Sequence, residues 1–516
     1  MVSPRLYELG TLSVLVASRS AWELSHGITY LDPSSPVSRN LQIGGYQGLE
    51  ERWLLEKSLR IPNLPGSSSC MRLSKLLAPS FAQQLLAQVQ SQSYAVDNDS
   101  VDGLPSFEYY PMINGTWSDE ELGKLLQPMV QELILPYVRS RYSCEECTVA
   151  EILVRRYLSE ERRTHNLHFD GHAYATVVLG LTPPDEYEGG LYIQPTPHSN
   201  SRRFVQLEPG DLFVHSFDLQ HGVRLWSGSR YSLIFWIKSS PAAVATGTTP
   251  WYHRSAAEGD PDAMYNLAGQ FLQGIEGEVD VMEALRLYEK AAKMGHYGAQ
   301  HHLSLMLLEA AEPNELVRAA RGLRHAADAG FALAQKSLAF AYANGQGLSQ
   351  DLAKAAHWML QAAEQDDLEA AYVLSSMYRH GQGFPTNNLE ADRWLRASAE
   401  ANYADAMREI AEQQLRVTPA NWSGYEFWLR RAARQRDAAS MRLLAELVQE
   451  RGDGEAVSLW RKLVKLGDPE AQWQLGRCYA TGRGTLPVKP AKARALLPGQ
   501  GQKDILAKEC VYSGRV

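Results

Sequence analysis

Residues 208–237 read EPGDLFVHSFDLQHGVRLWSGSRYSLIFWI and contain two strand-like runs, Asp211–His215 and Tyr231–Ile237. Both runs are rich in Val, Ile, Phe and Tyr, which favour β-strands. Similar runs lie upstream at 175–181 and 191–194, and Gly, Pro, Asp and Asn separate them. Several short strands at this spacing predict an all-β sandwich or barrel core.

Two helical patterns precede the strands, over residues 73–92 and 119–141. We expect Ser118 to be the N-cap of the second helix, because a hydroxyl can accept from the first free backbone N–H groups. The barrel is therefore predicted to carry flanking helices.

After about residue 250 the pattern becomes helical and repetitive. Small residues recur 32 to 36 positions apart, at Ala263, Ala299, Ala334, Ala370, Ala406, Ala439 and Ala471. Gly-x-Gly turns at 345–347 and 381–383 separate paired helices, and the units from Tyr297 and Asn402 lack this turn. One helix pair cannot bury its own apolar face, so successive pairs must stack into a solenoid.

Residues 251–497 resemble Sel1-type repeats, which are related to tetratricopeptide repeats. The resemblance implies an all-α solenoid that binds a protein substrate or partner. An array that only packs against the N-terminal half and stabilises it is the alternative.

Composition excludes several other classes of protein. The chain has 516 residues, a net charge of −8 and 45% hydrophobic residues, which fits packed globular domains, two to four in number. The sequence contains no run of about 18 apolar residues, so we predict no membrane span. Neither half is basic, so we expect no nucleic-acid partner.

Five scattered cysteines do not form a disulfide framework. Cys144 and Cys147 have metal-type spacing without a second pair, and we expect free thiols there. This sparse usage favours a reducing compartment such as the cytoplasm over the secretory pathway.

The chemistry-bearing residues lie between Tyr157 and Trp236. His168, Asp170 and His221 offer two imidazoles and one carboxylate, the facial triad suited to non-haem Fe(II) enzymes that use oxygen. Residues two apart in a strand point the same way, so His168 and Asp170 can share a metal. Arg230 opens an apolar strand nine residues after His221 and can form a bidentate pair with a carboxylate.

In this order of residues the segment resembles the Fe(II)- and 2-oxoglutarate-dependent dioxygenases, in the prolyl 4-hydroxylase-like branch. The resemblance implies a double-stranded β-helix, or jelly-roll, with iron held by His168, Asp170 and His221. It implies that Arg230 anchors 2-oxoglutarate, with O2 as oxidant and ascorbate as a supporting reductant. The positions that further contact the cosubstrate or line its pocket would be Ser232, Tyr157, Thr176, Trp236 and Val223.

One position departs from the family. Gly180 stands where some members carry a second tyrosine, and we expect its absence to widen the pocket. We expect hydroxylation of a protein or peptide side chain, with proline first among the candidates. The same chemistry on a small molecule or nucleobase is an alternative, as is a non-catalytic scaffold.

The predicted organisation is multidomain. We expect an N-terminal extension at 1–69, the dioxygenase domain at 70–240, a linker at 241–250, the repeats at 251–497 and a tail at 498–516.

Overall fold

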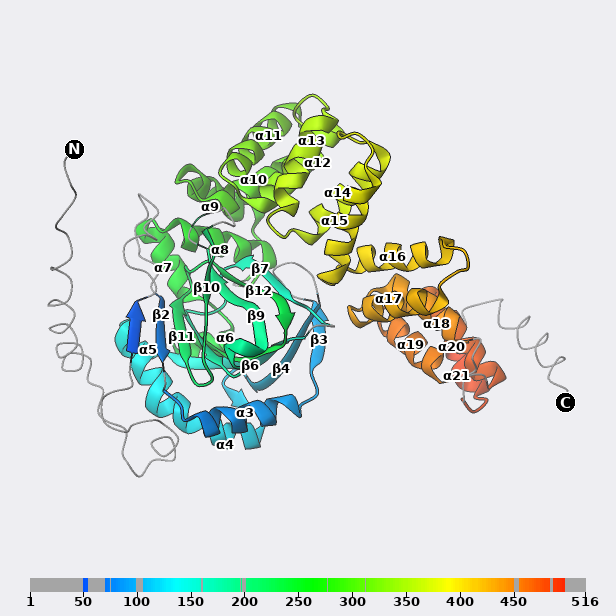
Figure 1. The fold of residues 1–516 in the computed structure, drawn as a ribbon. Coiled ribbons are helices and arrows are strands. Elements are labelled where there is room, and N and C mark those ends of the chain that lie inside the picture. The colour runs from blue at the N-terminus through cyan, green and yellow to red at the C-terminus, as the bar shows by residue number, and fades with distance from the viewer. Residues whose placement is uncertain are drawn as a thin grey trace, which may run out of the picture. The chain divides into compact units, whose positions relative to one another are not determined.

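A computed structural model describes residues 50–53, 70–74, 76–98, 105–158, 161–194, 196, 201–275, 277–310, 312–449, 454–482 and 486–496. Of the predicted extension, only residues 50–53 lie within these ranges. None of the predicted tail does. The chain forms two compact units (Figure 1). The first holds most described residues up to Phe331, and the second holds those from Ala332 onward.

The first unit contains two antiparallel sheets. The larger sheet has the order β1-β2-β11-β8-β13-β6-β4-β3, with β5 on β4. Its strands are β1 (Glu50–Trp53), β2 (Cys70–Ser74), β3 (Ala95–Asn98), β4 (Pro105–Ile113), β5 (Thr116–Trp117), β6 (Thr148–Tyr157), β8 (Ala175–Gly180), β11 (Leu212–Ser216) and β13 (Arg230–Lys238). The smaller sheet has the order β10-β9-β12-β7, formed by β7 (Thr164–His168), β9 (Tyr187–Ile193), β10 (Arg203–Val205) and β12 (His221–Gly228).

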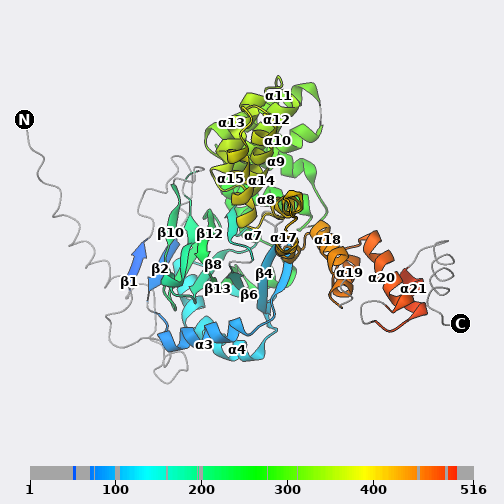
Figure 2. The same cartoon turned by 45° about the vertical axis from the view of Figure 1, so that its right-hand side comes forward.

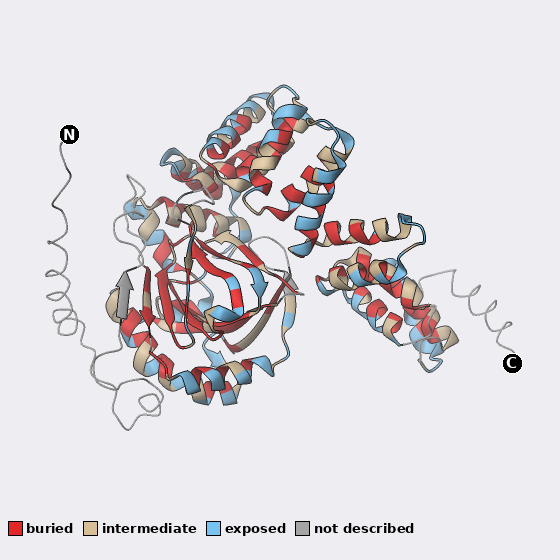
Figure 3. Ribbon diagram, in the orientation of Figure 1, coloured by how far each residue is buried: buried red, intermediate tan, exposed pale blue. Residues whose placement is uncertain are grey.

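Helices cover one face of the larger sheet (Figures 1 and 2). They are α3 (Pro79–Gln90), α4 (Glu120–Met129), the π-helical turn η1 (Val130–Ile134) and α5 (Leu135–Arg141). Their apolar side chains share a core with residues of the sheet, as Leu85 and Leu126 do with Leu233 and Phe235. The other face of the sheet is buried too, so β13 is almost wholly buried (Figure 3).

The predicted helices are partly correct. The second pattern matches α4 to α5, but its N-cap is Asp119, whose carboxylate accepts from the N–H groups of Glu121 and Leu122. The prediction of Ser118 as N-cap is therefore wrong by one residue. The first pattern begins too early, because β2 ends at Ser74 and α3 begins at Pro79. Residues 70–73 pair with β11, and apolar residues alone did not distinguish that strand from a helix.

The helical hairpins confirm the predicted all-α array. In the first unit they are α6 (Pro241–Thr246), α7 (Pro250–Glu258), α8 (Pro261–Gln273), α9 (Val281–Lys293), α10 (Tyr297–Ala310) and α11 (Pro313–Asp328). In the second they are α12 (Ala332–Asn344), α13 (Leu352–Ala363), α14 (Leu368–His380), α15 (Asn388–Glu400), α16 (Ala404–Arg416), α17 (Trp422–Arg434), α18 (Ala438–Gln449), α19 (Glu455–Lys465), α20 (Pro469–Thr481) and α21 (Pro490–Leu496). The segment predicted as a linker, 241–250, contains α6 and the first residue of α7.

Turn chemistry explains the regular spacing of these hairpins. Gly381 caps α14 with φ of 69°, a backbone region that β-carbons disfavour. A β-carbon at Gly383 would approach the Leu352 carbonyl oxygen to 2.1 Å, so this turn admits only glycine. No helix within the described ranges has the length and apolarity needed to cross a membrane.

Two cysteine expectations have different outcomes. Cys144 and Cys147 form a disulfide across a Cα–Cα distance of 5.4 Å, so the expectation of free thiols is wrong for this pair. The tight turn after α5 brings both side chains within bonding range. Cys70 and Cys478 are buried and are not part of this bond, and Cys510 lies outside the described residues.

Candidate metal centre

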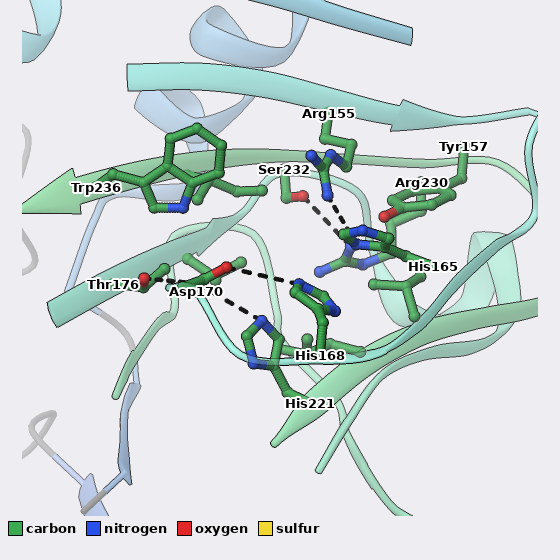
Figure 4. A pocket seen from close by; sticks show the side chains of 14 residues that line it. Arg155, Tyr157, His165, His168, Asp170, Thr176, His221, Arg230, Ser232 and Trp236 are labelled. Carbon is green, nitrogen blue, oxygen red and sulfur yellow. Dashed lines mark hydrogen bonds and ion pairs between the residues drawn. The ribbon is translucent and has the colours of Figure 1, made fainter. Parts of the chain in front are cut away.

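Three side chains far apart in the sequence converge inside the two sheets. His168 ends β7 and His221 begins β12, and these residues are direct partners in the antiparallel pair. Asp170 lies in the turn that follows β7. One ligand atom from each residue lies within 4.8 Å of those from the other two (Figure 4).

The geometry corrects one step of the sequence argument. Asp170 is not in a strand, so the two-residue strand period does not bring it to His168. The turn does so, with the Gly171 N–H bonded to the Phe169 carbonyl and the Ala173 N–H to that of Asp170. One Asp170 oxygen lies 3.6 Å from Nε2 of His168, and the other lies 3.6 Å from Nε2 of His221.

Hydrogen bonds on the far side of each imidazole fix its tautomer. Nδ1 of His168 lies 2.7 Å from the Asn166 carbonyl oxygen, and Nδ1 of His221 lies 3.1 Å from that of Leu219. Because a carbonyl only accepts, each Nδ1 carries a hydrogen, so the neutral form of each ring has its lone pair on Nε2. Both imidazoles are therefore oriented as metal ligands.

Burial and charge keep the donor set ready for a cation. Burial lowers the pKa of His221 well below its ordinary value, which favours the neutral, metal-binding form. Burial alone would raise the pKa of Asp170, but the imidazoles of His221, His168 and His215 outweigh it and hold that pKa well below the usual range. The Thr176 hydroxyl donates to Oδ2 of Asp170 at 2.6 Å.

The predicted cosubstrate residues line the same pocket. Arg230, Ser232 and Trp236 alternate along β13 and point inward, as the two-residue period of a strand requires. Tyr157, at the end of β6, is the strand partner of Arg230. Arg230 is only 3% exposed, and its Nη1 donates to the Ser232 hydroxyl at 3.3 Å. The pocket lining also includes Thr176 and Val223.

Two further pocket residues escaped the sequence argument. Arg155 pairs with the Glu108 carboxylate, and its Nη1 donates to Nδ1 of His165 at 2.8 Å. The His165 ring lies 3.9 Å from that of His168, centroid to centroid. Arg155 lies two residues before Tyr157 on β6, so strand alternation could have found it.

A third imidazole approaches the carboxylate. His215 on β11 is fully buried, and its Nε2 lies 3.6 Å from Oδ2 of Asp170. Nothing in its local sequence marks this position, because β11 reaches the site only through pairing with β8.

The pocket is not widened at Gly180. A β-carbon there would lie 2.8 Å from Cβ of Leu207 and 3.0 Å from the Glu208 carbonyl oxygen. Leu207 is 1% exposed and belongs to the inner core, so it fills the space that the sequence left open.

A half-buried carboxyl lies on the loop that leads to His221. Burial raises the pKa of Asp218 to about 7, and the Ser216 hydroxyl opposes this by donating to it. The nearby carboxylates of Asp262 and Asp260 raise it further.

Comparison with known proteins identifies the repeats. The family model for the Sel1 repeat matches residues 261–296, 332–367, 368–403 and 469–497. It passes over 297–331, the unit that begins at Tyr297 and lacks the Gly-x-Gly turn. The array is thus built from Sel1 repeats, which typically mediate protein–protein interaction. A comparison with curated proteins found no match.

Solved structures similar to parts of the chain include Sel1 repeat proteins and an oxygenase. A protective antigen, c5321, from uropathogenic Escherichia coli has 24% identity over 50% of this chain and 56% of its own length, with a TM-score of 0.37. A Sel1 repeat protein from Oxalobacter formigenes has 24% identity over 52% of this chain and 81% of its own, with a TM-score of 0.42. An oxidoreductase of the 2OG-Fe(II) oxygenase family from Burkholderia pseudomallei has 16% identity over 30% of this chain and 78% of its own, with a TM-score of 0.24.

Proposed function

We propose that the protein is an Fe(II)- and 2-oxoglutarate-dependent dioxygenase that hydroxylates a C–H bond of a protein or peptide side chain. One observation carries the proposal: His168, Asp170 and His221 converge in a pocket that also contains the buried guanidinium of Arg230. A metal-ligand triad and an anion anchor in one cavity are what this chemistry requires.

The strand order supports a double-stranded β-helix. Along the chain β6, β8, β11 and β13 join the larger sheet, and β7, β9, β10 and β12 join the smaller one. The chain therefore passes repeatedly between two facing antiparallel sheets, as in a jelly-roll. The proposed site lies between these sheets.

The donor set fits Fe(II). Two imidazoles and one carboxylate would provide the ligand types of a facial triad, which leaves room for a cosubstrate and O2. With iron bound, the reaction would convert substrate C–H, O2 and 2-oxoglutarate into C–OH, succinate and CO2. Arg230 would grip the distal carboxylate of 2-oxoglutarate, with Ser232 and Tyr157 beside it.

Two other residues would shape the site. Thr176 would donate to Oδ2 of Asp170 and so fix the carboxylate's orientation. Trp236 and Val223 would supply apolar wall and limit the entry of water.

The Sel1 repeats motivate a macromolecular substrate. An array that binds proteins, in the same chain as the pocket, can raise the local concentration of a protein or peptide near the reactive centre. Proline remains the first candidate side chain.

The test is incubation of the full chain with Fe(II), ascorbate, 2-oxoglutarate and a broad peptide panel. We expect succinate and a peptide mass gain of about one oxygen atom, both lost in His168→Ala. The matched control is Arg156→Leu, since this side chain lies over the ring of Tyr94 rather than in the pocket. Wild-type protein that makes no succinate with any peptide, despite bound iron, would contradict the proposal.

A further inference from the structure

One buried residue of the first Sel1 repeat breaks the pattern of the array. In the four matched units a buried alanine, Ala263, Ala334, Ala370 or Ala471, is followed seven residues later by Gln270, Ala341, Met377 or Cys478. All four of these later residues are buried, with exposures of 6%, 0%, 5% and 4%. Only Gln270 carries a polar amide, and burying an amide is costly unless it is hydrogen-bonded.

The side-chain amide of Gln270 is hydrogen-bonded to the turn that carries Asp170. Its Nε2 donates to the Gly171 carbonyl oxygen at 3.2 Å, and its Oε1 accepts from the Thr249 hydroxyl. Gly171 is the residue directly after Asp170. A helix of the repeat array therefore holds the backbone next to a proposed metal ligand.

Other contacts of the same helix pair support this coupling. A β-carbon on Gly171 would lie 3.0 Å from Oδ1 of Asn266, so α8 lies close against the turn. On the other side of Asp170, the Phe169 ring lies 6.1 Å from the rings of both Tyr265 and His296. Both chain neighbours of Asp170 thus contact the first repeat.

We infer that Gln270 is a positioning residue for the metal centre, and that the first Sel1 repeat is a working part of the oxygenase site. The inference rests on the proposed function, because it assumes that Asp170 binds a metal. The repeat holds the Phe169–Gly171 turn so that the Asp170 carboxylate faces the two imidazoles. Without these contacts the turn has fewer restraints. Ordering the three ligands would then cost part of the free energy of metal binding.

The test is Gln270→Met in the full chain, titrated with Co(II) alone under anaerobic conditions. Methionine is the residue that the third matched unit carries at this position, so the helix core can accept it. We expect Co(II) affinity to fall about tenfold, toward the lower end of the effect of losing an outer-shell partner. The Co(II) absorption bands should also change, because ligand geometry around the metal changes.

The matched control is Gln335→Met. Gln335 is a glutamine of α12, 3% exposed, whose Oε1 accepts from Nε2 of Gln365 at 2.7 Å. It belongs to the other compact unit. We expect a comparable loss of thermal stability in this variant, with unchanged Co(II) affinity and spectrum.

A second variant guards against a folding defect in the first. Thr249→Val removes the hydroxyl that orients the Gln270 amide and should weaken Co(II) binding in the same direction by a smaller factor. If Gln270→Met binds Co(II) with the same affinity as the wild type, the inference is overturned and the proposed function still stands. Wild-type protein that binds Co(II) no better than His168→Ala overturns both.

Discussion

Replacing Arg230 is the sharpest test of how the pocket would recognise its cosubstrate. The side chain begins β13, is 3% exposed, and has the Ser232 hydroxyl as a hydrogen-bond partner. In Arg230→Leu the pocket loses this guanidinium, while the three proposed metal ligands are untouched. In Arg230→Lys a positive charge remains but the planar pair of donors is lost.

The expected magnitude follows from burial. Because Arg230 is almost fully buried, solvent screens its interaction with a carboxylate only weakly. Removing one partner of a buried ion pair costs about 3–5 kcal/mol, so 2-oxoglutarate affinity should fall by roughly 10² to 10³·⁵ in Arg230→Leu. For Arg230→Lys we expect roughly a tenfold loss, since the charge is kept and the bidentate geometry is not.

The assay is an anaerobic calorimetric titration of the Fe(II)-loaded full chain with 2-oxoglutarate. Co(II) affinity measured without 2-oxoglutarate should be the same in wild type and both variants, which separates cosubstrate binding from metal binding. Arg156→Leu is the control for loss of an arginine from the same sheet outside the pocket. If Arg230→Leu binds 2-oxoglutarate within about threefold of wild type, a difference of less than 1 kcal/mol, the anchor is elsewhere and the reasoning fails.

Three further changes have expected outcomes. Thr176→Val keeps the side-chain shape but removes the donor to Asp170, so Co(II) affinity in a direct titration should fall about tenfold or more; unchanged affinity would mean that the carboxylate needs no such support. Gly180→Ala brings a β-carbon against Leu207 and should lower the free energy of unfolding by about 1–3 kcal/mol in urea titration, whereas an open pocket would tolerate it. The raised pKa of Asp218, about 7, means that the folded state holds this proton more tightly than the unfolded state does, so stability should fall as pH rises from about 4 to about 7. Between unfolding curves at pH 5 and pH 8, Asp218→Asn should reduce this decline in the free energy of unfolding by at most about 3 kcal/mol, and by less because water reaches the partly exposed side chain.

The sequence was most informative where short motifs carry chemistry. The order of His168, Asp170, His221 and Arg230 was enough to name residues that the structure brings into one pocket. The Sel1 repeats were also predictable, because small residues recur at a regular spacing and several units share the turn glycines. Both signals depend on residue type at a fixed spacing along the chain.

The rest depended on which strands are neighbours. Strand alternation places Arg155 on the same face of β6 as Tyr157, but that face meets the pocket only because β6 pairs with β13. His215 reaches Asp170 because β11 pairs with β8. Leu207 fills the space beside Gly180 because of how its loop folds back on the sheet. Such contacts follow from strand register, which a single sequence does not specify.

The strand-like pattern gives way to a helical one after about residue 250, but the boundary between the compact units does not lie there. The first compact unit continues to Phe331, so the two antiparallel sheets and the helices up to α11 belong to the same unit. Helical periodicity reports the local shape of a segment, whereas the amide of Gln270 reports what the segment packs against. A polar residue at a buried, otherwise apolar repeat position requires a specific partner. In this chain the partner is the backbone beside Asp170, which makes the first repeat a structural support for the proposed metal centre as well as the start of a binding array.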